Sequence, residues 1–241
     1  MDQLAQLQQW VDESRYIVFF GGAGVSTESG VPDFRSVDGL YRQKYPYPPE
    51  TILSHTFYAR KPEEFFRFYR EKMLFPDARP NAAHLKLAEL ERAGKLAAVV
   101  TQNIDGLHQA AGSREVLELH GSVHRNYCEG CRKFFDFDYM RAGAEVPICD
   151  RCGGRVKPDV VLYEEALDEA TMSKALRHIQ RADLLIVGGT SLAVYPAAGL
   201  VNYYRGNRLV LINKSPTPYD ASADLLIAAP IGEVLGAIEV A

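Results

Sequence analysis

Seven short, mainly apolar runs constrain the fold of this chain more than any other feature. They are predicted as strands: residues 16–20, 96–100, 116–119, 159–163, 183–187, 208–212 and 224–228. Helical patterns lie between most of them, at residues 2–13, 81–92, 165–181, 196–204 and 232–238. Strands that alternate with helices form parallel sheets with right-handed crossovers. The sequence therefore predicts an α/β fold, a Rossmann-like parallel sheet with helices on both faces.

Two stretches interrupt this alternation. Residues 39–75 combine a proline-rich segment with an aromatic helix that starts at Pro62. Residues 125–157 contain all four cysteines of the chain. We interpret the first stretch as a helical insertion and the second as a small metal-binding module. The Rossmann-like domain then consists of residues 1–38, 76–124 and 158–241.

The four cysteines form two pairs with the spacing of a metal ribbon. Cys128-x-x-Cys131 is followed, after seventeen residues, by Cys149-x-x-Cys152. Two such turns offer four thiolates to one tetrahedral Zn²⁺, and four thiolates leave no position for water. The pattern therefore predicts a structural zinc rather than a catalytic one. An iron–sulfur cluster is the competing interpretation.

Glycine-rich turns follow two of the predicted strands. GGAGVST at 21–27 follows the first strand, and GGTS at 188–191 follows a later one. Such a turn before a helix lets backbone N–H groups approach a phosphate, although glycine turns also occur for steric reasons alone. A hydride-transfer enzyme would show G-x-G-x-x-G and an acidic residue about 20 residues later. This chain instead continues into a loop with Phe34 and Arg35, which predicts a dinucleotide that is not a hydride carrier.

A polar cluster follows the strand at 96–100. Gln102, Asn103 and Asp105 come directly after this strand, and His120 ends the next one. The carboxyl ends of parallel strands are where ligands bind in open α/β sheets. Each residue alone could be a cap, a turn residue or a buried imidazole. Together they indicate a site in which His120 is the candidate general base.

Composition and charge exclude other classes of protein. The net charge is −4 and the pI is about 5.9, so no global basic surface for nucleic acid is expected. No apolar run approaches the roughly 20 residues of a membrane span. The N-terminal residues have no signal-peptide pattern, and clustered cysteines favour metal binding in a reducing compartment. We therefore expect a cytoplasmic protein.

The motifs together resemble one family. They are GAGVS at 22–26, GVPDFR at 30–35, TQNIDGLH at 101–108, LHG at 119–121, the two cysteine pairs and GTSLAVYPAA at 189–198. This set resembles the sirtuin (Sir2) family of NAD-dependent protein lysine deacylases, in particular its compact bacterial and archaeal members. The resemblance implies that NAD is a co-substrate and that an acyl-lysine peptide binds between the large domain and the zinc module. It also implies that nicotinamide and O-acyl-ADP-ribose are products.

The resemblance assigns roles to individual residues. It implies that His120 is the general base and that Asn103 and Asp105 are further catalytic residues, which orient the nicotinamide. The implied NAD contacts are Ala23, Gly24, Thr27, Phe34, Arg35, Gln102, Asn103, Ile104, Asp105, His120, Gly189, Thr190, Ser191, Asn213 and Ile231. The resemblance also implies that the peptide pairs between two loops, residues 160–164 and 192–195. The implied peptide contacts on them are Val160, Tyr163, Leu192, Ala193, Val194 and Tyr195.

One departure from the family concerns the first peptide loop. The family commonly has Phe-Gly-Glu where this chain has Tyr163-Glu164-Glu165. Loss of that glycine leaves the path of the peptide open. Members that remove succinyl groups resemble one another in a Tyr-x-x-Arg on the helical insertion. Here Phe66 and Tyr69 align with those positions, which predicts a preference for acetyl-lysine over succinyl-lysine.

Two other functions are compatible with the same motifs. NAD glycohydrolysis or ADP-ribosyl transfer would use the same site with a different nucleophile. A zinc-ribbon module could alternatively bind nucleic acid, although the acidic pI and the few basic residues near the cysteine turns argue against it.

Overall fold

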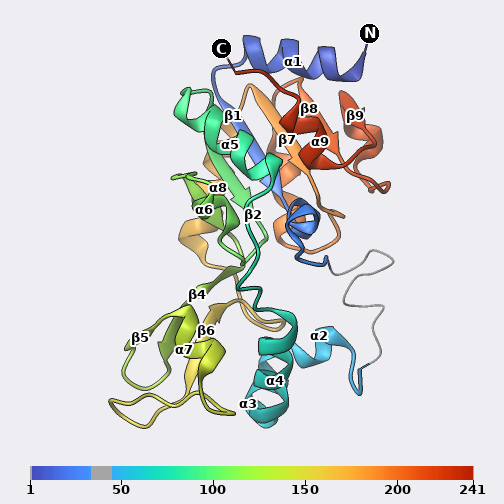
Figure 1. Cartoon of the computed structure of the whole chain (residues 1–241). Helices are drawn as coiled ribbons and strands as arrows, with labels where there is room; N and C mark the ends of the chain where they lie inside the picture. The colour runs from blue at the N-terminus through green and yellow to red at the C-terminus, as the bar shows by residue number, and fades with distance from the viewer. Residues whose placement is uncertain (1, 34–44, 241) are drawn as a thin grey trace.

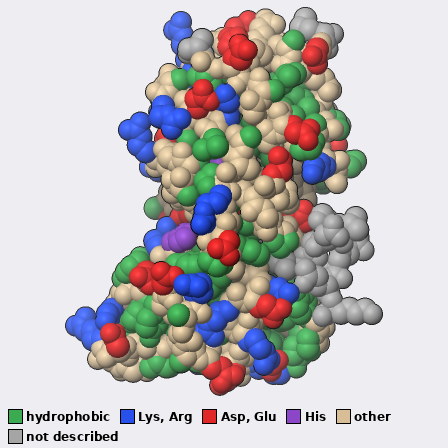
Figure 2. Space-filling model, in the orientation of Figure 1, with side chains coloured by type: hydrophobic (Ala, Val, Ile, Leu, Met, Phe, Trp, Pro, Cys, Tyr) green, Lys and Arg blue, Asp and Glu red, His purple; other side chains and the backbone are tan. Residues whose placement is uncertain are grey.

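The computed structural model describes residues 2–33 and 45–240. Phe34 and Arg35, two of the predicted NAD contacts, lie outside the described residues. A large sheet flanked by helices forms the upper part of the molecule in Figure 1, and a small sheet with a group of helices forms the lower part. Acidic and basic side chains are interspersed over the visible face (Figure 2), in keeping with the small net charge.

The large sheet has six strands in the order β3-β2-β1-β7-β8-β9. Every neighbouring pair in it is parallel. Six of the seven predicted strands are thereby confirmed. The bounds are β1 Ile17–Gly21, β2 Leu96–Thr101, β3 Val116–Glu118, β7 Leu184–Gly188, β8 Leu209–Ile212 and β9 Leu225–Ile227.

Helices cover both faces of this sheet, as the sequence predicts. In β1, Ile17 and Phe19 pack into a core with α1 (Gln3–Glu13), α5 (Ala82–Arg92) and α9 (Ile231–Gly236). Alternate residues of a strand face opposite sides of the sheet. The next residues, Val18 and Phe20, therefore pack into a second core with α8 (Glu169–Arg181) and the 3-10 helix η4 (Ala197–Tyr203).

The seventh predicted strand, at 159–163, is wrong in both position and sheet. The strand in this region, β6, runs Val156–Val160 and pairs antiparallel with β4 (Gly121–Cys128). The short β5 (Phe134–Phe135) completes this three-stranded sheet. Burial alternates along β6, with Val156, Pro158 and Val160 inside. This is the pattern of an antiparallel strand with one open face, whereas the apolar run at 160–162 suggested a fully buried one.

The small sheet shares its core with the helical insertion. Three helices precede it in the chain: α2 (Pro49–Ile52), α3 (His55–Arg60) and α4 (Pro62–Lys72). Ile52 of α2 and the aromatic side chains of α3 and α4 form one buried cluster with Cys128, Cys149 and Val156 of the cysteine module (residues 125–157) and with Met140 of α7 (Phe137–Ala142). The metal-binding segment, which is too short to bury a core by itself, is therefore packed against a segment more than fifty residues away in the sequence.

Several predicted helices differ in extent. Between β1 and residue 33, the chain forms two 3-10 turns, η1 (Ala23–Val25) and η2 (Thr27–Ser29), and no α-helix. A short helix, α6 (Leu107–Ala110), follows Asp105, and a further 3-10 turn, η5, spans Asp220–Ser222. Helix α8 begins at Glu169 rather than at residue 165 because Asp168 accepts a hydrogen bond from the Thr171 N–H as its N-cap. Among the described residues, no helix is both long and apolar enough to cross a membrane.

Candidate active site

Two glycine turns meet at the carboxyl ends of β1 and β7. The Gly24 N–H donates to the Gly189 carbonyl oxygen over 2.8 Å. A β-carbon on Gly24 would lie 2.8 Å from that oxygen, and one on Gly189, whose φ is +59°, would lie 2.3 Å from the Val25 nitrogen. The glycines therefore allow two backbone segments to pack closely. They place the two predicted phosphate-binding turns side by side at one edge of the sheet.

Ser26 links the two polar residues that follow β2. Its hydroxyl donates to Asp105 Oδ2 over 2.7 Å and accepts from Asn103 Nδ2 over 3.1 Å. Ser26 is fully buried and Asn103 nearly so. Asp105 Oδ1 also accepts from the Leu107 N–H at the start of α6. Asn103 and Asp105 are thereby held in fixed orientations, as a site that must orient a ligand requires.

Sequence reasoning missed Ser26 as a functional residue. It stands in the GAGVS motif, but the interpretation of that motif stopped at its glycines and at Thr27. The signal was present, because a polar side chain directly after a buried strand and a glycine turn needs a hydrogen-bonding partner when it is buried. Its partners lie 77 and 79 residues further along the chain.

Gln102 and Thr190 connect the ends of β2 and β7. The Gln102 side-chain Nε2 donates to Thr190 Oγ1 over 3.0 Å. The same hydroxyl accepts from the Leu192 N–H over 3.2 Å, so it fixes the start of the second predicted peptide loop. The Gln102 N–H donates to the Gly21 carbonyl oxygen. Gln102 therefore joins the turn after β1, the turn after β2 and the turn after β7.

His120 lies where the two sheets meet. Its Nδ1 is 3.0 Å from the Gln102 carbonyl oxygen. A carbonyl oxygen only accepts hydrogen bonds, so Nδ1 carries the proton and Nε2 of the neutral ring holds a free lone pair. The following residue, Gly121, has a φ of +76°, and a β-carbon there would lie 1.9 Å from the Asp159 carbonyl oxygen. Close approach of β6 therefore requires glycine directly after the histidine.

Burial affects the protonation state of His120. Desolvation lowers the pKa of its imidazole, and the hydrogen bond to the Gln102 carbonyl opposes this effect in part. A lowered pKa keeps the ring neutral near pH 7, which a general base requires.

Asn213 and Ile231 lie on the β8 side of this edge. Asn213 Oδ1 accepts from the Thr190 N–H over 2.9 Å, while its buried Nδ2 has no partner among the described residues. A buried donor without an acceptor fits a site that is completed by a ligand oxygen. Ile231 is buried and packs against Gly188, where a β-carbon would lie 2.2 Å from Ile231 Cδ1. It therefore supports the end of β7 from inside the core.

The remaining predicted cofactor residues line the same strand ends. Ala23, Gly24 and Thr27 are half-buried in the turns after β1, and the Thr27 hydroxyl donates to the Gly24 carbonyl oxygen. Ile104 is half-buried, and its carbonyl oxygen accepts from the Val123 N–H of β4. Ser191 is exposed just after Thr190.

The predicted peptide contacts lie on two segments. Val160, which is buried, ends β6, and Tyr163 is exposed in the loop beyond it. Leu192 is buried with a φ of +52°, and its side chain packs beneath the sheet. Tyr195 is 66% exposed and its hydroxyl is 3.3 Å from that of Tyr219. Ala193 is also exposed and Val194 is half-buried.

A pair of buried histidines lies near the Asp105 turn. The rings of His84 and His108 are 4.7 Å apart, and both residues are almost completely buried. Neither His108 nitrogen has a partner among the described residues, and the same holds for His84 Nε2. Burial lowers the pKa of His84 to about 4 and the pKa of His108 well below its usual value. Both rings are therefore neutral at pH 7.

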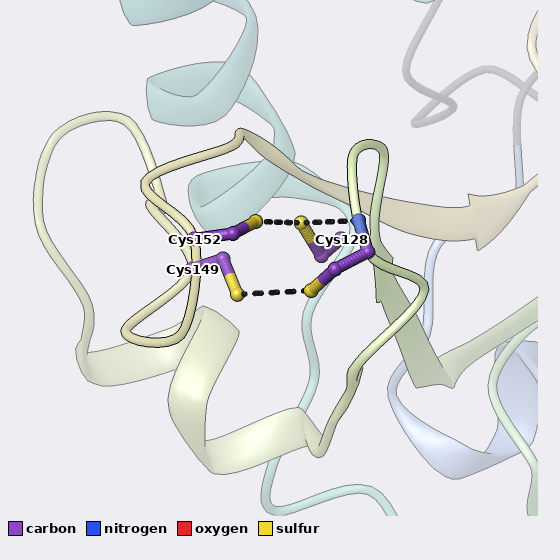
Figure 3. Close-up of side chains that lie close together, drawn as sticks. Cys128, Cys149 and Cys152 are labelled. Carbon is purple, nitrogen blue, oxygen red and sulfur yellow. Dashed lines mark hydrogen bonds between the residues drawn. The ribbon is translucent and has the colours of Figure 1, made fainter.

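The four cysteines converge as predicted (Figure 3). Their sulfur atoms all lie within 4.8 Å of one another. Cys128 Sγ is 3.3 Å from Cys152 Sγ, and Cys131 Sγ is 3.6 Å from Cys149 Sγ. Zn–S bonds of about 2.3 Å in a tetrahedron place sulfurs about 3.8 Å apart, so the group has the size of a zinc site. The Cys131 N–H points at Cys128 Sγ over 3.4 Å, as expected for a sulfur that carries negative charge as a metal ligand.

Comparison with known proteins gives a consistent result. The model of the Sir2 family matches residues 22–196. The chain is 61% identical over 238 residues to an NAD-dependent protein deacetylase of Clostridium acetobutylicum, covering 98% of this chain and 97% of that protein. It is 54% identical over 236 residues to an NAD-dependent protein deacetylase of Cutibacterium acnes, covering 97% and 96%.

Solved structures are similar over nearly the whole chain. A structure described as "Structural Basis for the Mechanism and Regulation of Sir2 Enzymes" has a TM-score of 0.88 and 42% identity, covering 98% of this chain and 95% of that one. A complex of Sir2 with p53 peptide and NAD⁺ has a TM-score of 0.86 and 39% identity, covering 96% and 95%. A Sir2 complex with deacetylated p53 peptide and 3′-O-acetyl-ADP-ribose has a TM-score of 0.88 and 39% identity, with the same coverage.

Proposed function

The chain belongs to the Sir2 family of NAD-dependent protein deacetylases, and from that premise we propose which of its residues perform the reaction. The enzyme transfers the acyl group of an acyl-lysine to ADP-ribose and releases nicotinamide and O-acyl-ADP-ribose. One observation carries the assignment of residues. Asn103, Asp105 and His120 converge at the ends of neighbouring strands, and Ser26 and Gln102 hold them there by hydrogen bonds.

His120 acts as the general base. When bound, NAD would supply a ribose hydroxyl to which the acyl group moves from the lysine nitrogen, and Nε2 of the neutral His120 ring would accept the proton of that hydroxyl. The Gln102 carbonyl fixes the ring tautomer, so the lone pair lies on the nitrogen away from the protein backbone.

Asn103 and Asp105 orient the nicotinamide end of NAD. Their side chains are already held by the Ser26 hydroxyl, so no ordering of these groups is needed when NAD binds. Ser26 is part of this proposal as a positioning residue. On the adenosine side, the free Nδ2 of Asn213 would donate to the co-substrate, next to Thr190 and Ser191. Ala23, Gly24, Thr27, Gln102, Ile104, Gly189 and Ile231, together with Phe34 and Arg35, complete the proposed NAD contacts.

The four cysteines hold a structural zinc. They would fill a tetrahedral shell, and strands β4, β5 and β6, whose connecting segments carry the cysteines, lie in the lower part of the molecule (Figure 1). Its metal supports the shared core of the cysteine module and the helical insertion.

The division of the chain and its location are also proposals. We propose that residues 1–38, 76–124 and 158–241 bind NAD, that 39–75 form the cofactor-loop and helical insertion, and that 125–157 form the zinc module. The motifs of the NAD site, which all fall in the first set, support this division. We further propose the cytoplasm as the location, because a reducing compartment keeps the four thiols available to metal.

The substrate is an acyl-lysine whose acyl group is neutral. Phe66 and Tyr69 of α4 are completely buried, and Arg67 is exposed. The Arg70 guanidinium donates to the carbonyl oxygens of Met140, Ala144 and Glu145, so it is occupied in holding the end of α7. A succinyl carboxylate in an apolar channel would lack a charged partner, which would weaken binding by several kcal/mol. Acetyl groups incur no such cost.

A panel of acyl-lysine peptides with NAD tests both parts of the proposal. Mass spectrometry should show O-acyl-ADP-ribose and the deacylated peptide. Free ADP-ribose or ADP-ribosylated protein as the main product would instead support glycohydrolysis or ADP-ribosyl transfer at the same site. The kcat/KM should be higher on an acetyl-lysine peptide than on the succinyl version of that peptide. Equal or higher efficiency on succinyl-lysine contradicts the acyl preference.

A further inference from the structure

Glu164, in the loop after β6, has a backbone conformation that glycine adopts without strain. Its φ is +76°, in the left-handed region that few non-glycine residues occupy. Glutamate therefore takes the place of the family's glycine in the sequence, while the backbone keeps a conformation typical of glycine. An interaction of the glutamate side chain must compensate for the strained backbone.

The Glu164 carboxylate caps helix α3. Its Oε2 accepts from the Thr56 N–H over 2.8 Å, and Thr56 is the second residue of this helix. The N–H groups of the first helical turn have no partners within the helix. The loop supplies a second acceptor there, because the Tyr163 carbonyl oxygen accepts from the His55 N–H over 3.0 Å. Two of the exposed donors at the start of α3 are therefore satisfied by residues more than a hundred positions later.

Further bonds hold the same loop in place. The Tyr163 N–H donates to the Leu53 carbonyl oxygen over 3.0 Å. The Glu165 carboxylate accepts from the Leu162 N–H over 2.9 Å and pairs with Lys157 Nζ over 3.1 Å. It also lies 2.8 Å from His55 Nδ1. The residues from 160 to 165 are thus fixed against the helical insertion on one side and against β6 on the other.

We infer that Glu164 is a positioning residue that docks the first peptide loop, residues 160–164, on helix α3 and thereby sets the affinity for the acyl-peptide. The inference rests on the proposed role of this loop in peptide binding. A peptide that pairs with a backbone edge binds more tightly when that edge is ordered beforehand. The proposed NAD contacts lie on other strand ends, so NAD affinity should not depend on the contact between Glu164 and helix α3.

The hydrogen bond from Thr56 and the nearby charges of His55 and Arg60 lower the pKa of Glu164. The side chain is therefore a carboxylate at neutral pH. Glutamine at this position would still offer an oxygen to Thr56, whereas alanine and glycine would not.

Steady-state kinetics of the zinc-bound enzyme on an acetyl-lysine peptide test the inference. Glu164→Ala should raise the peptide KM roughly three- to tenfold, as expected for loss of one charge-assisted hydrogen bond, with kcat and the NAD KM within about twofold. Glu164→Gln should restore most of the affinity. Glu164→Gly should behave like Glu164→Ala, although it relieves the backbone strain. Glu63→Ala, an exposed acid in the first turn of α4, is the matched control and should change nothing.

Amide hydrogen exchange provides a readout that needs no activity. Exchange at residues 54–57 should be faster in Glu164→Ala than in the wild type, and unchanged in Glu63→Ala. A peptide KM for Glu164→Ala equal to that of the wild type, or unaltered exchange at Thr56, overturns the inference. Absence of deacylation by the wild-type protein would instead refute the proposed function. The exchange experiment would still test whether Glu164 holds the start of helix α3.

Discussion

At the scale of single residues, the chemistry depends on how the protein fixes a few nitrogen and oxygen atoms. In the proposed mechanism His120 is the base, because one of its nitrogens is held by a carbonyl oxygen and burial keeps the ring neutral. Asn103 and Asp105 are ordered because one hydroxyl, that of Ser26, bonds both. In both cases the hydrogen-bonding partner comes from a different segment of the chain, Gln102 after β2 or Ser26 after β1.

His120→Ala should lower the deacetylation kcat by about 100- to 10,000-fold, because a positioned general base contributes that much. Nicotinamide exchange should survive better, since departure of nicotinamide precedes proton transfer to the base. Assays of both reactions on the same preparation measure the difference. His178→Ala, a half-buried histidine bonded to Tyr16 far along α8, is the control and should keep activity within about twofold of the wild type. Near-wild-type turnover of His120→Ala would remove His120 from its role.

The buried pair His84 and His108 predicts a loss of stability in acid. Their folded pKa values lie below the unfolded value of about 6.5, so the unfolded chain binds more protons once the pH falls below that value. Stability should thus be fully present above about pH 6.5 and decline towards pH 4. Each of these buried histidines should lower the free energy of unfolding by about 1 kcal/mol as the pH falls from 7.5 to 5.5.

His108→Leu removes one of these groups. Urea unfolding of both proteins at pH 7.5 and 5.5 gives the change in unfolding free energy. The variant should lose about 1 kcal/mol less than the wild type over this interval. An identical pH dependence of the two proteins would show that His108 binds a proton equally well in the folded state.

At the scale of elements, the two parts of the molecule achieve their stability differently. The central strands β1, β7 and β8 of the large sheet are buried on both faces. The small sheet has three strands, one of them only two residues long, and the turns beside them carry the cysteine cluster. Val123, Phe135, Val156 and Val160 of this sheet all lie in the core that it shares with α3 and α4.

Cys149→Ser should therefore abolish stoichiometric zinc binding and lower the Tm by about 10 °C or more. Activity should fall indirectly, because the helical insertion loses part of its packing. Elemental analysis and thermal unfolding measure the two effects, with one zinc per chain expected for the wild type. Iron in place of zinc, or a Cys149→Ser protein with full zinc content, would contradict the assignment.

At the scale of the whole molecule, Arg125 of β4 connects the two sheets. Its guanidinium bonds Glu118 Oε2 at the end of β3 over 2.6 Å and Asp159 Oδ2 on β6 over 2.8 Å. The Glu118 side chain is only 7% exposed, so its carboxylate depends on this partner. The junction that carries His120 is thus held together by a charged group as well as by backbone contacts.

Arg125→Met should lower the unfolding free energy by about 1–3 kcal/mol, because it leaves a mostly buried carboxylate unpaired. Adding Glu118→Gln should recover part of the loss. Arg141→Met breaks an exposed pair with Asp138 and should cost at most about 0.5 kcal/mol. Urea denaturation of the four proteins gives the values. Equal effects of the two arginine substitutions would mean that Glu118 is well solvated without Arg125.

The sequence by itself determined the parallel sheet and the metal ligands. Strands buried on both faces are continuous apolar runs, and the two cysteine pairs need only local turns to form half a site each. It also identified Asn103, Asp105 and His120 as polar residues at strand ends. Those signals are local, so they can be read without knowing which segments meet.

Only the tertiary structure decided what depends on distant contacts. The strand near residue 160 belongs to the small sheet because β4 pairs with it, and its alternating burial follows from that partner. Ser26 became part of the site through residues almost eighty positions away. Glu164 keeps a glycine-like backbone because a helix from the insertion offers its carboxylate a donor. In each case the deciding free energy comes from a partner that the local sequence does not reveal.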